Sequence, residues 1–149
     1  MSTDEKVTKD LLETLEDGND GYTKGAEKLE GLSQPSLMAT FQQFADQRRR
    51  FADELQGMAK SYGDDPDRSG SIAAAAHRGW MTLKDALTKD DPTAVLEVAA
   101  QGDEHAVKEY EKALDDDISA DLRAVVSRQL GEIRAAHATL KTLTPSSSG

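Results

Sequence analysis

The sequence contains no cysteine, which excludes disulfide bonds, thiolate nucleophiles and zinc sites built on cysteine. Aromatic residues make up only 5% of its 149 residues, and runs of β-branched residues are almost absent, so a β-sheet is not expected. No apolar run approaches the roughly 18 residues that span a bilayer. We therefore expect a soluble, mostly helical protein that does not enter a membrane.

Positive charge is also scarce, because 18 basic residues face 28 acidic ones and the net charge is −10. Such a chain repels phosphate backbones, so nucleic acid is not expected as a partner. The first ten residues, MSTDEKVTKD, lack the apolar segment of a signal peptide. A cytoplasmic location is the expectation that follows.

Apolar residues recur in steps of three and four over four long stretches, as is typical of amphipathic helices. The predicted helices run from about Asp4 to Gly31, from a Ser33 N-cap to about Tyr62, over Pro92–Leu114, and from Ile118-Ser119 to Leu143. A shorter helix, roughly Ser71–Leu87, falls in the long connection between the second and third. The pattern predicts an all-α, ferritin-like up-down four-helix bundle with one long crossover carrying a short extra helix. We expect one domain over residues 1–149, with a core at about 4–143 and a disordered tail at 144–149.

Each long helix has one polar residue near the middle of its apolar stripe: Asn19, Arg48, Asp103 and Gln129. A carboxylate buried without a partner costs several kcal/mol, so Asp103 needs one. We predict a mid-bundle polar layer in which Arg48 pairs with Asp103 and the two amides satisfy the remaining groups. Its expected role is to fix helix register. The alternative is that Arg48 extends outward and Asp103 faces solvent beside Glu104.

Dimetal sites in ferritin-like bundles use two Glu-x-x-His pairs, which place carboxylate and imidazole on one helix face. None of the three histidines follows a glutamate at this spacing, so the motif is absent. We expect no metal cofactor. A non-standard iron or manganese site would have to draw on six side chains: Asp17, Asp20, Asp103, Glu104, Glu132 and His137.

Three glycines lie within the first predicted helix, Gly18, Gly21 and Gly25, and each costs about 1 kcal/mol relative to alanine. They predict the close approach of a neighbouring helix or a ligand. His77 and Trp80, on the predicted crossover helix, either form a surface for a small ligand or simply cover a face of the bundle.

Four pieces of the chain together resemble a bacterial ferritin-like family of small, stress-associated four-helix-bundle proteins of uncharacterised function: Asp17-Gly18…Gly21-Tyr22, His77-Arg78-Gly79-Trp80, Gly102-Asp103-Glu104…Tyr110 and Gln129…His137. The resemblance covers about residues 5–143. It implies the fold and a soluble bacterial protein, and it supplies no established activity.

The function expected from these observations is non-enzymatic. The bundle would act through association along a helix face, as a homodimer or with a protein partner, and a stress role is implied by the resemblance alone. One alternative is a dimetal carboxylate oxidase or peroxidase, or an iron-handling protein, with degenerate ligands. Another is a binding module whose crossover helix holds a small molecule.

Overall fold

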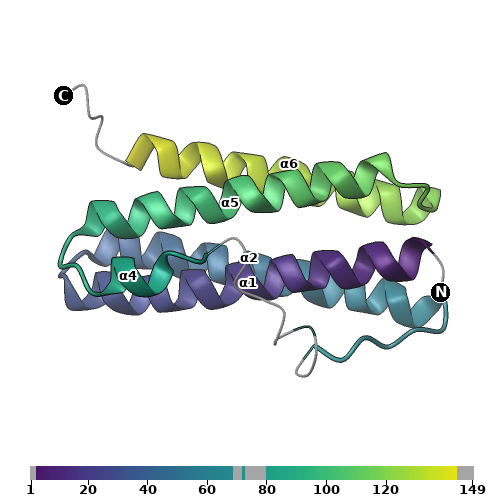
Figure 1. Cartoon of the computed structure of the whole chain (residues 1–149), viewed down its shortest axis with the longest axis horizontal. Helices are drawn as coiled ribbons and strands as arrows, with labels where there is room; N and C mark the ends of the chain where they lie inside the picture. The colour runs from purple at the N-terminus through teal and green to yellow at the C-terminus, as the bar shows by residue number, and fades with distance from the viewer. Residues whose placement is uncertain (1–2, 69–71, 73–79, 144–149) are drawn as a thin grey trace.

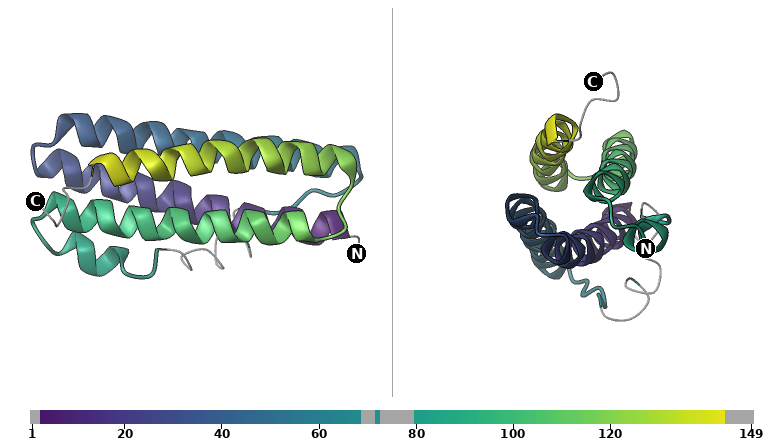
Figure 2. Two further views of the ribbon diagram at one scale, coloured as in Figure 1. Left: turned by 90° about the horizontal axis from the view of Figure 1, so that it is seen from above. Right: turned by 90° about the vertical axis from the view of Figure 1, so that its left-hand side faces the viewer.

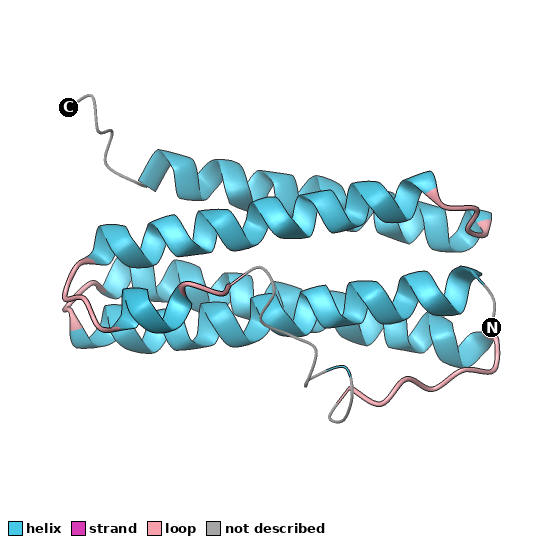
Figure 3. Ribbon diagram, in the orientation of Figure 1, coloured by secondary structure: helices cyan, strands magenta, loops and turns pink. Residues whose placement is uncertain are grey.

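The computed structural model describes residues 3–68, 72 and 80–143, and all regular structure within them is helical (Figure 3). The all-α prediction is confirmed. The four long helices are α1 (Thr3–Gly31), α2 (Pro35–Ser61), α5 (Pro92–Asp115) and α6 (Ala120–Leu143), and the short α4 (Leu83–Leu87) precedes α5. In this described part of the chain, no helix is both long and apolar enough to cross a membrane.

The long helices form two antiparallel hairpins that pack against each other (Figures 1 and 2). α1 and α2 make the first hairpin and α5 and α6 the second, while α1 also packs on α5 and α2 on α6. Because α2 and α5 run in the same direction, the chain must return along the length of the bundle between them (Figure 1). The core is therefore enclosed by four helices from two hairpins.

Short polar side chains cap the starts of the last two long helices. The Asp91 carboxylate accepts the backbone N–H of Thr93 at 3.0 Å, which caps α5, and Pro92 occupies its first turn. The Ser119 hydroxyl accepts the backbone N–H of Leu122 at 3.3 Å at the start of α6. A short polar side chain thus marks the start of each helix, and each cap involves residues only two or three positions apart.

The prediction of Ser33 as an N-cap is wrong. Gln34 precedes α2 and makes no side-chain cap, while Ser33 has a φ of 59° in the left-handed region. The Gln34 N–H binds the Leu29 carbonyl at 3.0 Å and the Ser33 N–H binds the Glu30 carbonyl at 3.1 Å. This is a Schellman ending of α1, so Ser33 occupies the position that glycine usually takes after a helix.

The predicted crossover helix over Ser71–Leu87 is wrong at Trp80, which lies in a turn before α4. Positions 69–71 and 73–79, His77 among them, fall outside the described residues. The apolar spacing misleads here because Trp80 is buried by inserting between α1 and α5, not by a helical face of its own. Nearer α2, Arg68 anchors the connection by binding Glu16 at 2.8 Å and Asp53 at 2.5 Å.

The buried apolar side chains form two clusters, one toward each end of the bundle. The first cluster includes Leu11, Leu15, Phe51, Leu55, Ile72, Ala106, Tyr110, Val126 and Ile133. The second includes Tyr22, Leu29, Phe41, Trp80, Val95, Leu96, Ala99 and Leu140. Leu143, the predicted and observed end of the last helix, is 37% exposed and lies outside both clusters. The candidate site lies where the two clusters meet.

Candidate functional site

A buried ion pair separates the two apolar clusters. Arg48 lies on α2 between Ala45 of one cluster and Phe51 of the other, and Asp103 lies on α5 between Ala99 and Ala106. The Arg48 Nη1 donates to the Asp103 Oδ1 at 2.8 Å, and the two side chains are 1% and 0% exposed. Both residues thus face inward and meet, and the outward-facing alternative does not occur.

Tyr22 of α1 completes this group. Its hydroxyl donates to the Asp103 Oδ2 at 2.7 Å, so each carboxylate oxygen of Asp103 accepts one hydrogen bond from another helix. The Tyr22 ring also packs edge-on against Trp80, with ring centroids 4.9 Å apart. We call Tyr22, Arg48 and Asp103 the buried triad. It joins α1, α2 and α5 through three side chains.

Burial and charge set the protonation states of Tyr22 and Arg48. Burial, and after it the Asp103 carboxylate, raises the pKa of Tyr22 well above its ordinary value, so the phenol stays neutral and donates. Burial opposes the charge of Arg48, but the Asp103 carboxylate outweighs this and raises the pKa of the guanidinium. The triad is therefore an ionised pair with a neutral tyrosine as a second donor.

A helical glycine makes room for the guanidinium. A Cβ at Gly18 of α1 would lie 3.3 Å from the Arg48 Cγ, tighter than ordinary contact. The Arg48 Cζ lies 5.3 Å from the Tyr22 ring centroid, within the range of a cation–π contact. The Arg48 Nη2 has no hydrogen-bond partner within the described residues, and such a buried donor costs about 1–3 kcal/mol. The ring face offsets part of that cost.

Gln129 belongs to a second buried hydrogen-bonded group. Its Oε1 accepts the Tyr110 hydroxyl at 2.7 Å, and its Nε2 donates to the Glu54 Oε1 at 2.9 Å and to the Phe51 carbonyl at 3.3 Å. Glu54 also binds Arg128 at the surface. This second group joins α5 to α2 through α6, and it uses none of the triad's atoms.

Asn19 lies at the edge of the core, where its amide donates to the Ala45 carbonyl of α2 at 2.9 Å. The inward positions of α1 at this height are instead Asp17, 3% exposed, and Gly18. Because Gly18 has no side chain, it does not appear in the pattern of apolar steps, and the pattern points to Asn19 instead. The two amides of the predicted layer therefore satisfy other groups, and Tyr22 takes the role expected of them.

The Trp80 indole fills a slot between α1 and α5. A Cβ at Gly21 or at Gly102 would overlap the indole atoms, so both helices need glycine there. Gly25 is similar, because a Cβ at this position would lie 2.7 Å from the Phe41 ring. The prediction that the glycines of the first helix mark close approaches is confirmed. The approaching groups are side chains of α2 and of the crossover.

The six side chains considered for a metal do not converge within the described residues, where no group of three His, Asp or Glu could hold a metal ion. Glu104 and His137 approach each other, with Oε1 and Nε2 3.6 Å apart. Asp20 pairs with Lys24 at 3.1 Å and Glu132 with Arg128 at 3.3 Å. Asp103 serves the triad, and Asp17 is buried on α1.

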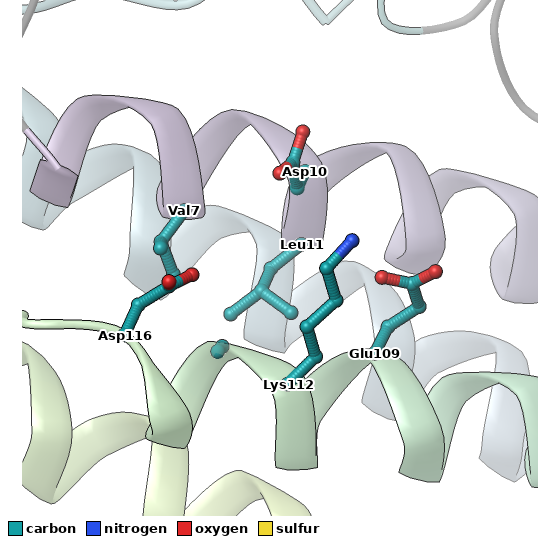
Figure 4. A pocket seen from close by; sticks show the side chains of 7 residues that line it. Val7, Asp10, Leu11, Glu109, Lys112 and Asp116 are labelled. Carbon is teal, nitrogen blue, oxygen red and sulfur yellow. The ribbon is translucent and has the colours of Figure 1, made fainter.

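A small depression lies between α1 and α5 near the start of α1 (Figure 4). Its volume is about 10 Å³, room for about one water molecule. The residues that line it are Val7, Asp10, Leu11, Glu109, Lys112, Ala113 and Asp116. It is too small for a ligand, so the buried triad remains the principal candidate site.

Comparison with known proteins gives a family without an assigned activity. The model of a domain of unknown function, DUF2383, matches residues 5–116, which include the buried triad, Gly102 and Trp80. No curated protein matches the sequence. The matched range ends before α6, so Gln129 and His137 lie outside it.

Proposed function

We propose that this chain, which belongs to the DUF2383 family of unknown function, is a non-enzymatic, ferritin-like bundle that acts through protein association. In this proposal the buried triad occupies the mid-bundle level at which ferritin-like proteins hold two metals. In this proposal the protein is bacterial and its role is related to stress, as the sequence resemblance implies, and its location is cytoplasmic. It has no cofactor.

One observation carries the proposal: both oxygens of the Asp103 carboxylate are already engaged, by Arg48 and by Tyr22. A metal at this level would have to displace a hydrogen-bonded guanidinium that is 1% exposed. Removing one partner of a buried ion pair typically costs about 3–5 kcal/mol, so that displacement is unfavourable. The triad supports a structural role, in which a polar contact fixes the relative register of three helices.

Metal content tests the non-enzymatic part of the proposal. Tag-free protein is incubated anaerobically with ferrous iron, desalted, and measured by mass spectrometry before and after exposure to oxygen. We expect substoichiometric iron and no oxidation beyond that of buffer. Binding of two irons per chain would contradict the proposal and would identify a dimetal oxidase with unfamiliar ligands.

Solution mass tests the association part. Sedimentation equilibrium over a range of protein concentrations is expected to give twice the chain mass of 16.1 kDa, which corresponds to a homodimer. A chain that stays monomeric throughout and captures no protein partner would contradict association as the mode of action.

A dimetal carboxylate oxidase or peroxidase, or an iron-handling protein, is the second candidate. The observation that favours it is the approach of Glu104 to His137 at 3.6 Å, a carboxylate and an imidazole on facing helices. Iron bound by such a site would be lost in Glu104→Gln and in His137→Ala, and it would be retained in the surface variant Glu111→Gln. Loss of iron in the first two variants but not in Glu111→Gln would distinguish a specific iron site from nonspecifically bound iron.

A further inference from the structure

We propose that the groove between α1 and α4, beside Trp80, binds an amphiphilic anion with an apolar body, such as a medium-chain carboxylate. The groove is open to solvent on one side, and its volume of about 530 Å³ lies within the roughly 300–1,000 Å³ of ordinary ligand sites. This inference goes beyond the proposed function, because it uses a different surface and none of the triad's hydrogen bonds.

The groove has an apolar wall and floor. Leu83 and Leu87 stand one turn apart on α4, and Trp80 and Met81 come from the turn before that helix. Met81 is 80% exposed, whereas the only other large apolar side chain exposed in the described residues is Leu143, at 37%. Exposed methionine is common at surfaces that accept apolar ligands, because its side chain adapts to their shape. The apolar body of a ligand would lie along this wall.

Two lysines stand at the rim in a chain whose net charge is −10. Lys24 and the acidic Asp20 line the groove from α1, and Lys84 lines it from α4. Lys24 binds Asp20 at 3.1 Å, whereas the ammonium of Lys84 makes no ion pair within the described residues. An anionic head group complements this rim, with Lys84 as its principal contact. A cation of the same shape would meet the same lysines unfavourably.

Trp80 supplies the means to detect binding. It is the only tryptophan of the chain, and it both lines the groove and packs against Tyr22. A ligand in the groove therefore contacts the single fluorophore with tryptophan emission. Decanoate serves as the probe, titrated below its micellar range into the full chain. Acetate and decyltrimethylammonium are titrated in parallel, because they test the head group alone and the same apolar tail with opposite charge.

We expect decanoate to change the Trp80 emission saturably, while acetate has no effect and the cation binds at least tenfold more weakly. Lys84→Met should weaken the affinity for decanoate about fivefold, which is the effect expected from the loss of one exposed ion contact. Leu87→Asp should abolish binding, because it places a carboxylate in the apolar wall. Lys89→Met is the matched control: Lys89 follows α4 and pairs with Asp85 outside the groove, and its loss should leave the affinity within twofold.

Three results would overturn the proposal. Decanoate could bind Leu87→Asp as tightly as the unaltered chain, which would place it elsewhere. Decyltrimethylammonium could bind equally well, which would show apolar adsorption without head-group recognition. Leu87→Asp could change the sedimentation mass while decanoate has no effect on Trp80, which would assign the groove to a protein contact. Circular dichroism of each variant verifies the helical fold, and none of these outcomes depends on iron binding.

Discussion

Arg48 and Asp103 form their ion pair at 2.8 Å at the level where the two apolar clusters of the core meet. Arg48 lies on α2 and Asp103 on α5, so the pair forms only because these two helices lie across the bundle from each other. The Tyr22 hydroxyl on the second carboxylate oxygen then ties α1 to the same point. The Asp103 carboxylate of α5 therefore links α1, α2 and α5 at one height along the bundle.

A double-mutant cycle measures this coupling. We expect Arg48→Met and Asp103→Leu each to lower the free energy of unfolding by about 3–5 kcal/mol, because each leaves a buried charge alone. The double variant should lose clearly less than the sum, since no charge remains unpaired. Urea denaturation supplies the three values. Arg49→Met, which breaks only an exposed pair with Asp46, is the control and should shift stability by no more than about 0.5 kcal/mol.

If a single variant fails to fold while the double variant folds, the cycle still demonstrates the coupling. Strictly additive losses would instead show that the two side chains do not depend on each other, and the structural role of the triad would have to be abandoned.

Gly102→Ala should expel the Trp80 indole from its slot, because the added Cβ would overlap the ring. We expect a red shift of the tryptophan emission, stronger quenching by acrylamide, and a loss of about 1–3 kcal/mol of stability from overpacking. Gly131→Ala is the matched control on α6, since a Cβ there meets nothing within 4 Å. It should leave the emission unchanged and stabilise the helix by about 1 kcal/mol. Identical spectra for the two variants would argue against the slot.

Ser33→Gly should stabilise the protein. Ser33 has a φ of 59° after the end of α1, a conformation that costs a non-glycine residue about 1–2 kcal/mol. Glycine removes this strain but has more conformational freedom to lose on folding, so we expect a net gain of about 0.5–1 kcal/mol. Thermal or urea unfolding measures the gain. Ser33→Val, with a β-branched side chain, should move stability in the opposite direction.

High pH should unfold the protein through its tyrosines. Burial raises the pKa of Tyr22, Tyr62 and Tyr110 above the ordinary value of 10.0. A raised pKa in the folded state means that folding favours the neutral phenol. The stability that comes from burying the neutral tyrosines is therefore fully present below about pH 10, and it is lost as the pH rises toward the pKa values of the folded state. The loss approaches about 1.4 kcal/mol per pH unit for each fully buried tyrosine.

Absorbance at 295 nm and circular dichroism, recorded together, measure this effect. We expect the tyrosinate signal of Tyr22 and Tyr110 to appear only as helicity disappears. Tyr62, which is half-buried and shares a 2.6 Å hydrogen bond with Thr8, is the internal comparison. Tyr62→Phe should change the loss of stability at high pH less than Tyr110→Phe does. Full ionisation of all three tyrosines in a still-helical protein would contradict the buried environment.

The sequence alone determined the four long helices and most of their buried faces. Steps of three and four place Leu11, Phe51, Ala99 and Ile133 inward because an amphipathic helix has one period, and the Asp91 and Ser119 caps act within a single turn. Local rules also identified Arg48 and Asp103 as inward polar residues that need partners. These features depend on neighbours a few positions away, which is why they can be predicted without the fold.

Only the tertiary structure decided which inward polar groups meet. Asp103 binds Tyr22 as well as Arg48, while Gln129 binds Tyr110, because axial offsets between helices set the heights at which side chains face each other. Gly21 and Gly102 lie 81 positions apart and form one slot for Trp80 only when α1 and α5 are adjacent. The spacing of residues within one helix does not predict the axial offset between helices, because that offset depends on how the two hairpins pack.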